Sequence, residues 1–113
     1  MRTLLARTRR ALVEREALRR RVRESLPDLA AILVHEFGAS KVTVFGSVVT
    51  GFTSENPDLD LLVDGLPRER YAEALARLFL LAPLPVDLVP AEWGRPEVVA
   101  RARELGEVLD VAG

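Results

Sequence analysis

The hydrophobic pattern changes its period after Gly38, and this change constrains the fold more than any other feature of the sequence. Residues 3–24 contain no glycine or proline, and their apolar side chains recur at roughly helical spacing among arginines. Ser25-Leu-Pro-Asp28 resembles a capping box that opens a second helix, which is predicted to run to about Phe37 and to end at Gly38 in a left-handed conformation. Residues 41–45 are then β-branched and aromatic, which is typical of a strand.

Strand and helix patterns alternate through the rest of the chain. Strands are predicted over residues 58–64 and 84–89, and Pro85 places the second of these at a sheet edge or at its own first residue. Helices are predicted over residues 67–81 and 96–109. This order predicts an α/β fold, in which a small mixed sheet of about three strands is packed with helices and preceded by an extra N-terminal helix.

Length and composition narrow the class of protein. The 113 residues fit one domain, with residues 1–25 as a basic amphipathic helix and residues 26–113 as the domain proper. The absence of cysteine excludes disulfides and thiolate zinc sites. The longest apolar run, over residues 78–86, is short and interrupted by prolines, so no membrane span is predicted. Arginines follow the first methionine too closely for a signal peptide, and we expect a cytoplasmic protein.

Charge is distributed unevenly along the chain. Residues 1–25 carry nine arginines and three glutamates, a net charge of +6, whereas the remaining residues carry seven basic and fourteen acidic side chains, a net charge of −7. A basic helix on an acidic body indicates that the helix forms a surface for a partner. The partner can be another protein or a second copy of this chain, in which case the N-terminal helix forms a homo-oligomer. A nucleic acid is the least favoured partner, because the body of the protein is acidic.

Three aspartates stand in or beside predicted strands, where aspartate is normally disfavoured. Asp58 and Asp60 share one face of their strand because side chains alternate along it, and Asp87 comes from a neighbouring strand. Clustered carboxylates repel one another unless a cation neutralises them, and Mg²⁺ prefers a few carboxylates together with phosphate oxygens. The alternative is an amphipathic strand whose polar face is in water.

A glycine-serine pair follows the first predicted strand directly. Gly46 allows the backbone to approach a bulky anion closely, and Ser47 can add a hydroxyl donor to the amide groups of the turn. Phosphate is the ligand that this chemistry suits. The alternative role of Ser47 is that of an ordinary N-cap.

Taken together, these motifs resemble the nucleotidyltransferase superfamily related to DNA polymerase beta. The spacing of Gly46-Ser47, Asp58-Leu59-Asp60 and Asp87 is similar to that of the minimal nucleotidyltransferase (MNT) antitoxins, which are encoded beside HEPN-domain toxins. The resemblance implies that Gly46 and Ser47 bind the nucleotide, and that Asp58, Asp60 and Asp87 are catalytic residues and ligands of two Mg²⁺ ions. It covers residues 27–109.

The resemblance also implies an activity, namely transfer of a nucleoside monophosphate, AMP from ATP, to an acceptor hydroxyl. The implied acceptor is a tyrosine of a HEPN toxin, and this chain would then be the antitoxin. One departure is that the family motif reads Gly-Ser-Arg-x-x-Gly, whereas this chain has Val48 in place of the arginine and retains Gly51. The alternative is therefore a catalytically weakened antitoxin that neutralises its partner by contact.

Overall fold

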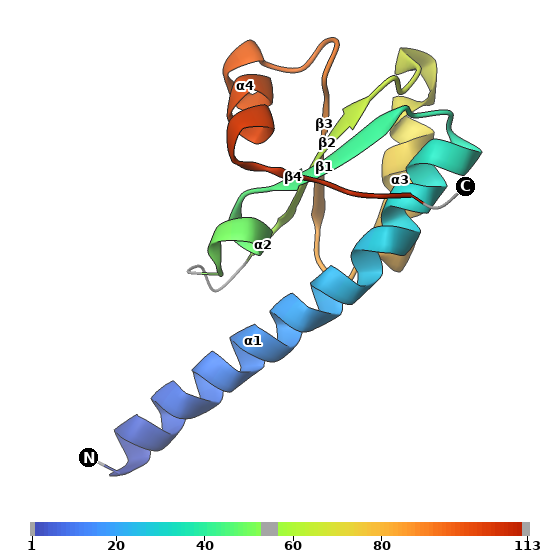
Figure 1. Cartoon of the computed structure of the whole chain (residues 1–113). Coiled ribbons are helices and arrows are strands. Elements are labelled where there is room, and N and C mark those ends of the chain that lie inside the picture. Colours follow the sequence, from blue (N-terminus) through green and yellow to red (C-terminus); the bar gives the residue numbers. More distant parts are fainter. Residues whose placement is uncertain (1, 53–56, 112–113) are drawn as a thin grey trace.

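A long helix leads into a mixed sheet that has helices on both faces (Figure 1). The computed structural model describes residues 2–52 and 57–111 of the chain. In chain order, its elements are α1 (Arg2–Ala31), a π-helical turn (Ile32–Glu36), β1 (Lys41–Phe45), α2 (Ser47–Thr50), β2 (Leu59–Asp64), a 3₁₀ turn (Arg68–Arg70), α3 (Tyr71–Leu81), β3 (Val86–Pro90), α4 (Pro96–Leu105) and β4 (Glu107–Val108).

The sheet has the strand order β3-β2-β1-β4, which confirms the predicted mixed α/β architecture and adds a fourth strand. β1 pairs antiparallel with β2 and with β4, and β2 pairs parallel with β3. The predicted helix over residues 96–109 is wrong at its end, because α4 stops at Leu105 and β4 follows. The chain lies so close to β1 at Gly106 that a Cβ atom there would collide with Thr43 and with the carbonyl oxygen of Val44.

The predicted helix boundary at Ser25 is also wrong. α1 runs through Ser25 and Pro27 without a break, and the Ser25 Oγ donates to the Val22 carbonyl oxygen at 2.6 Å instead of capping a new helix. Val22, Leu26 and Leu29 lie on one face of α1 and are at most 2% exposed. Burial of this continuous apolar stripe stabilises one long helix more than the local cap stabilises a second one.

Gly38 ends the helical segment as predicted. Its φ of 78° lies in the left-handed region, and its amide donates to the Val34 carbonyl oxygen at 3.1 Å. The next amide, that of Ala39, donates to the Leu33 carbonyl oxygen at 2.9 Å. These two bonds satisfy carbonyl groups at the end of the helix and turn the chain into β1.

Alternation along the strands gives the sheet two different faces. The second half of α1 and α3 cover one face, whose buried strand residues are Val42, Val44, Leu59, Leu61, Val63, Val86 and Leu88. α4 covers the other face, at the upper left in Figure 1, where Ala102 packs with Phe45, Leu62 and Val89. This second face also carries Asp60 and Asp87, beyond the residues that α4 buries.

The first half of α1 extends away from the sheet (Figure 1). Its apolar side chains Leu5, Leu12 and Val13 are 66%, 59% and 62% exposed. Further along α1, the side chains of Arg19 and Arg23 donate to backbone oxygens of α2, and Arg23 pairs with Glu107 at 2.8 Å. The helix crosses the predicted boundary between residues 1–25 and 26–113 unbroken. Among the described helices, none is long and apolar enough to cross a membrane.

Two truncations separate the exposed part of α1 from the part that packs on the sheet. Deleting residues 1–14 is expected to change the free energy of unfolding by less than about 0.5 kcal/mol, because the described side chains that it removes are exposed, apart from half-buried Ala11. Deleting residues 1–24 removes fully buried Val22 and the bonds of Arg19 and Arg23. This deletion is expected to cost about 2–4 kcal/mol in urea unfolding. Equal midpoints for the two truncated chains would contradict this account of α1.

Candidate active site

Two of the three predicted aspartates lie side by side on the sheet. Asp60 and Asp87 are register partners in the parallel pair β2–β3, and both point to the face that α4 partly covers. Leu62, the next residue of β2 on that face, is buried under α4, so the acidic surface is confined to one end of the strands. Asp58 precedes β2 and is exposed. The structure thus brings Asp60 and Asp87 together and leaves Asp58 at the margin.

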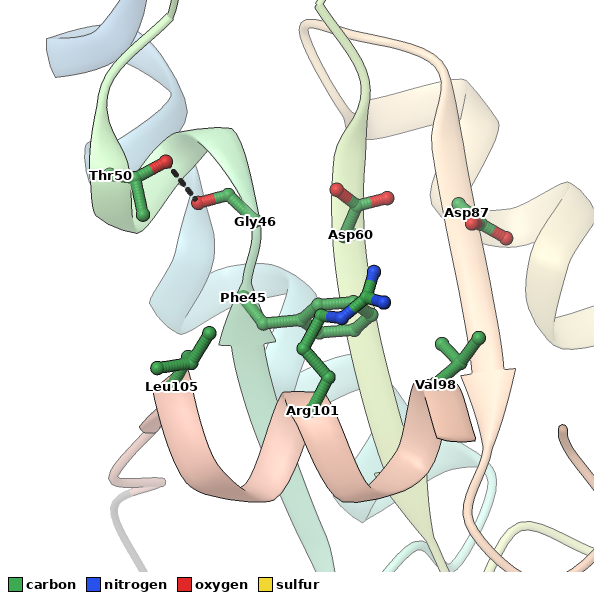
Figure 2. Close-up of a pocket in the computed structure, with 8 residues that line it drawn as sticks. All are labelled: Phe45, Gly46, Thr50, Asp60, Asp87, Val98, Arg101 and Leu105. Atoms are coloured by element: carbon green, nitrogen blue, oxygen red, sulfur yellow. Dashed lines mark hydrogen bonds between the residues drawn. The ribbon is translucent and has the colours of Figure 1, made fainter. Parts of the chain in front are cut away.

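The two carboxylates open into a cavity of about 430 Å³ between the sheet, the turn after β1 and α4 (Figure 2). The residues that line it are Phe45, Gly46, Thr50, Asp60, Asp87, Val98, Arg101 and Leu105. One side of the cavity is therefore acidic, one end is the backbone of a tight turn, and the helix wall is apolar except for a single guanidinium group. A cavity of this size suits a small-molecule ligand.

Gly46 is required by its contact with Asp60. Its φ of 74° lies in the left-handed region, and a Cβ atom at this position would overlap the Asp60 carboxylate. The glycine therefore lets the turn at the end of β1 lie directly against the carboxylate of β2. The glycine is thus explained by the Asp60 contact, and its predicted contact with the nucleotide stays a prediction.

Asp60 is electrostatically strained at neutral pH. Burial, together with the negative charges of Asp87 and Asp58, raises the pKa of the Asp60 carboxyl from 3.8 to about 6. Burial is the largest cause, and the neighbouring carboxylates add to it because like charges disfavour a further negative charge. A cation bound between Asp60 and Asp87 would relieve both effects.

The short helix α2 holds the turn rigidly. The amides of Val49 and Thr50 donate to the Gly46 carbonyl oxygen at 3.0 and 3.1 Å, and the Thr50 Oγ1 donates to the same oxygen at 3.2 Å. Ser47 does not cap α2, because its Oγ donates to the Asp58 carbonyl oxygen at 3.4 Å. Ser47 therefore ties the turn to the start of β2, and its predicted contact with the nucleotide stays a prediction.

Val48, which replaces the arginine of the family motif, lies inside the protein. Its side chain is fully buried in the core under α2, so it does not face the cavity. Its carbonyl oxygen accepts from Arg19 Nε at 3.2 Å and from Arg23 Nη2 at 3.4 Å. The two arginines of α1 thus bind the C-terminal end of α2, where positive charge is favourable.

Sequence reasoning missed the helix wall of the cavity. Val98, Arg101 and Leu105 recur at positions i, i+3 and i+7 of α4 and so lie on one face of that helix. This spacing was visible in the sequence, but nothing local indicated that the face would turn toward Asp60 and Asp87. Arg101 is the chemically most important of the missed residues, since it brings positive charge to an acidic cavity.

The carboxylates provide part of a metal site. Within residues 2–52 and 57–111, no three His, Cys, Asp or Glu side chains lie close enough together to hold a metal ion, so the predicted trio of aspartates is not preassembled. Asp60 and Asp87 nevertheless offer two hard oxygen donors on adjacent strands. This set fits Mg²⁺, which commonly takes one or two carboxylates and completes its shell with water and substrate phosphates.

Comparisons with known proteins identify the fold. Residues 2–87 match the family model described as "Poly(A) RNA polymerase, mitochondrial-like, central palm domain". A solved toxin-antitoxin complex with AMP-PNP has a TM-score of 0.63 at 20% identity, over 76% of this chain and 73% of that chain. A protein assigned to the minimal nucleotidyltransferases has a TM-score of 0.59 at 28% identity, over 78% of this chain and 91% of that chain. No curated protein sequence matches. The resemblance to minimal nucleotidyltransferases is thereby confirmed for the fold.

The strained carboxylate predicts a pH-dependent gain in stability for Asp60→Asn. The folded protein holds the Asp60 proton up to a pKa of about 6 and the unfolded chain releases it near 3.8, so ionisation costs stability as pH rises between these values. At pH 7.5, with a chelator present to remove divalent cations, we expect the free energy of unfolding of Asp60→Asn to exceed that of the unsubstituted protein by about 1 kcal/mol. This value is smaller than the pKa shift alone gives, because solvent screens the partly exposed carboxylate. The gain should disappear at pH 4 in thermal melts. Exposed Asp28→Asn is the control, and a gain of the same size at both pH values would contradict the assignment.

Proposed function

Because the chain belongs to the family of poly(A) RNA polymerase, mitochondrial-like, central palm domains, we propose that it is a Mg²⁺-dependent adenylyltransferase that moves AMP from ATP to an acceptor hydroxyl. The observation that carries the proposal is the pairing of Asp60 with Asp87 beside the Gly46 turn, in one cavity. A nucleotidyltransferase-type fold and a paired acidic site are the two features that this chemistry needs. The nucleotide specificity and the acceptor are the finer parts of the proposal.

Each part of the cavity has a role in this reaction. The Gly46 turn lies where it can meet the phosphates, and Asp60 and Asp87 would hold the two Mg²⁺ ions with Asp58 at the margin. When bound, these ions neutralise phosphate charge and lower the pKa of the acceptor hydroxyl. The acceptor oxygen forms a bond to the α-phosphorus, the bond from that phosphorus to the leaving pyrophosphate breaks, and Asp87 helps to remove the hydroxyl proton.

A second cavity beside Asp87 suits the acceptor. This cavity of about 280 Å³ shares Asp87 and Val98 with the first one and continues past Leu88, Val89, Pro90, Gly94 and Arg95 on β3 and the segment that follows it. Asp87 thus stands between the two cavities. An acceptor side chain in the second cavity would approach the nucleotide from the side of Asp87, the residue proposed to remove its proton.

We propose a tyrosine of a HEPN toxin as the acceptor. The structural neighbour that is a toxin-antitoxin complex with AMP-PNP supports a toxin partner and a nucleotide for this fold. The exposed, arginine-rich first half of α1 offers such a partner a long basic surface that includes Leu5, Leu12 and Val13. A partner with an acidic surface would complement it. The same helix is the proposed contact of a homo-oligomer.

A second candidate function is that of an antitoxin that acts by contact alone. It is favoured by Val48, because the turn beside the cavity carries no positively charged side chain. The two functions differ in whether the partner gains mass when it is neutralised.

Matched aspartate variants test the proposed transfer. Asp60→Asn is expected to weaken Mg-ATP binding and transfer together. Asp87→Asn should keep much of the ATP affinity and lose transfer by at least about 10²-fold, because Asp87 acts chiefly on the attacking hydroxyl. Asp28→Asn, which is exposed on α1, is the control. Transfer is followed as labelled AMP on the purified partner, and ATP binding is measured by calorimetry. Full transfer by Asp87→Asn would contradict its role, and neutralisation without any labelling would favour the contact function.

A further inference from the structure

Arg101 is held opposite the paired carboxylates by the packing of its helix. The neighbouring residue Ala102 is fully buried and packs with Phe45 and Leu62 of the sheet. Arg103, on the same helix, donates to the Asp64 carboxylate at 2.7 Å. These contacts anchor α4 directly after Arg101 in sequence. Figure 2 shows the Arg101 side chain extending from α4 toward the strands that carry Asp60 and Asp87.

The guanidinium group of Arg101 forms no hydrogen bond or close ion pair within the described part of the chain, although its positive charge also acts on exposed Glu97, one turn earlier on α4. The other two arginines at α4 are paired, Arg95 with Glu97 at 2.8 Å and Arg103 with Asp64. Arg101 forms no hydrogen bond or ion pair with any residue in 2–52 or 57–111, although it lines a cavity that contains two carboxylates. An arginine that faces a cavity with all its donors unused is available for a bound anion.

Arg101 is also the single positive charge among the described residues that line the cavity. The turn at residues 46–50 contributes a glycine, a serine, two valines and a threonine, so it supplies no cation of its own. The arginines of α1 that lie nearest this turn, Arg19 and Arg23, donate to backbone oxygens of α2. Positive charge from the protein therefore reaches the cavity from α4 and not from the turn.

We propose that Arg101 binds a phosphate group of the nucleotide, namely the phosphate that lies closest to Asp60 and Asp87. The inference rests on the proposed function, since it takes the ligand to be a nucleotide. A phosphate placed between the sheet and α4 presents oxygens to both walls. The oxygens on the side of α4 meet the guanidinium group, which can donate two parallel hydrogen bonds to them.

This contact assigns Arg101 a role in transfer as well as in binding. The phosphate nearest the carboxylates is the one that is attacked, and its non-bridging oxygens carry negative charge throughout the displacement. A guanidinium group carried by a packed helix lies on the cavity wall before the reaction and stabilises that charge.

Binding of a graded set of ligands tests the inference. The ligands are adenosine, AMP and ATP, each with Mg²⁺, and the proteins are the unsubstituted chain, Arg101→Gln, Arg101→Lys and the control Arg77→Gln. Arg77 lies on α3 and pairs with Glu36, so its variant loses the same charge elsewhere. Calorimetry gives the affinities, and a melt without ligand reports folding.

We expect Arg101→Gln to bind AMP and ATP roughly 10- to 100-fold more weakly, as for loss of a hydrogen bond between charged groups. Adenosine binding should be unchanged, and Arg101→Lys should recover only part of the loss, because an ammonium group restores the charge but not the two parallel hydrogen bonds. The melting temperature without ligand should change little, because Arg101 is exposed and forms no hydrogen bond with the described residues.

Three results would overturn the inference. Equal ATP binding by Arg101→Gln and the unsubstituted chain would show that Arg101 does not contact the phosphate, and the proposed function would still stand. An equal loss for adenosine shows a contact with the nucleoside instead. If the unsubstituted chain binds neither AMP nor ATP, the proposed function fails together with the inference.

Discussion

The contact between Gly46 and the Asp60 carboxylate is the constraint on which the rest of the site depends. It joins the end of β1 to the start of β2 at the point where the chain leaves the sheet and turns into α2. Because no side chain fits between them, the turn backbone and the carboxylate form one continuous surface. Asp87 extends that surface across β3, and α4 closes it on the opposite side.

This arrangement costs stability, and the rest of the fold offsets the cost. Asp60 is partly buried beside two other carboxylates, which is why the pKa of its carboxyl group is raised. The compensating burial comes from the opposite face of the sheet, where α1 contributes Leu26 and Leu29 to the core and the π-helical turn contributes Leu33. The candidate site on one face is thus supported by a conventional hydrophobic core on the other.

Local signals in the sequence were sufficient where a single residue type decides the structure. Gly38 and Gly46 both adopt positive φ, and the alternation of aspartate and leucine in β2 placed Asp60 on the face opposite to Leu59 and Leu61. The third strand and its aspartate were found for the same reason, since strand alternation depends only on neighbours in the chain.

The errors arose where distant contacts outweigh local preference. Ser25 and Pro27 carry signals of a helix boundary, yet burial of the stripe that includes Val22 and Leu26 keeps α1 continuous. The pattern after Leu105 is compatible with a helix, and the close packing of Gly106 on β1 makes it a strand. The role of the α4 face could not be predicted, because nothing near Arg101 in the sequence records that Asp60 and Asp87 lie across a cavity from it.

The most direct test of the central claim is the Mg-ATP affinity of Gly46→Ala compared with that of Gly38→Ala. Both substitutions place a side chain at a positive φ, at 74° and 78°. The ψ of −142° at residue 46 belongs to a region that only glycine adopts readily, so Gly46→Ala carries backbone strain in addition to its contact with the carboxylate, and a melt of each variant without ligand measures that strain separately. Only the Cβ atom at residue 46 meets the Asp60 carboxylate, whereas the one at residue 38 has open space. The account predicts that Gly38→Ala binds Mg-ATP as the unsubstituted chain does and that Gly46→Ala binds it at least about tenfold more weakly. Undiminished binding by a folded Gly46→Ala protein would contradict it.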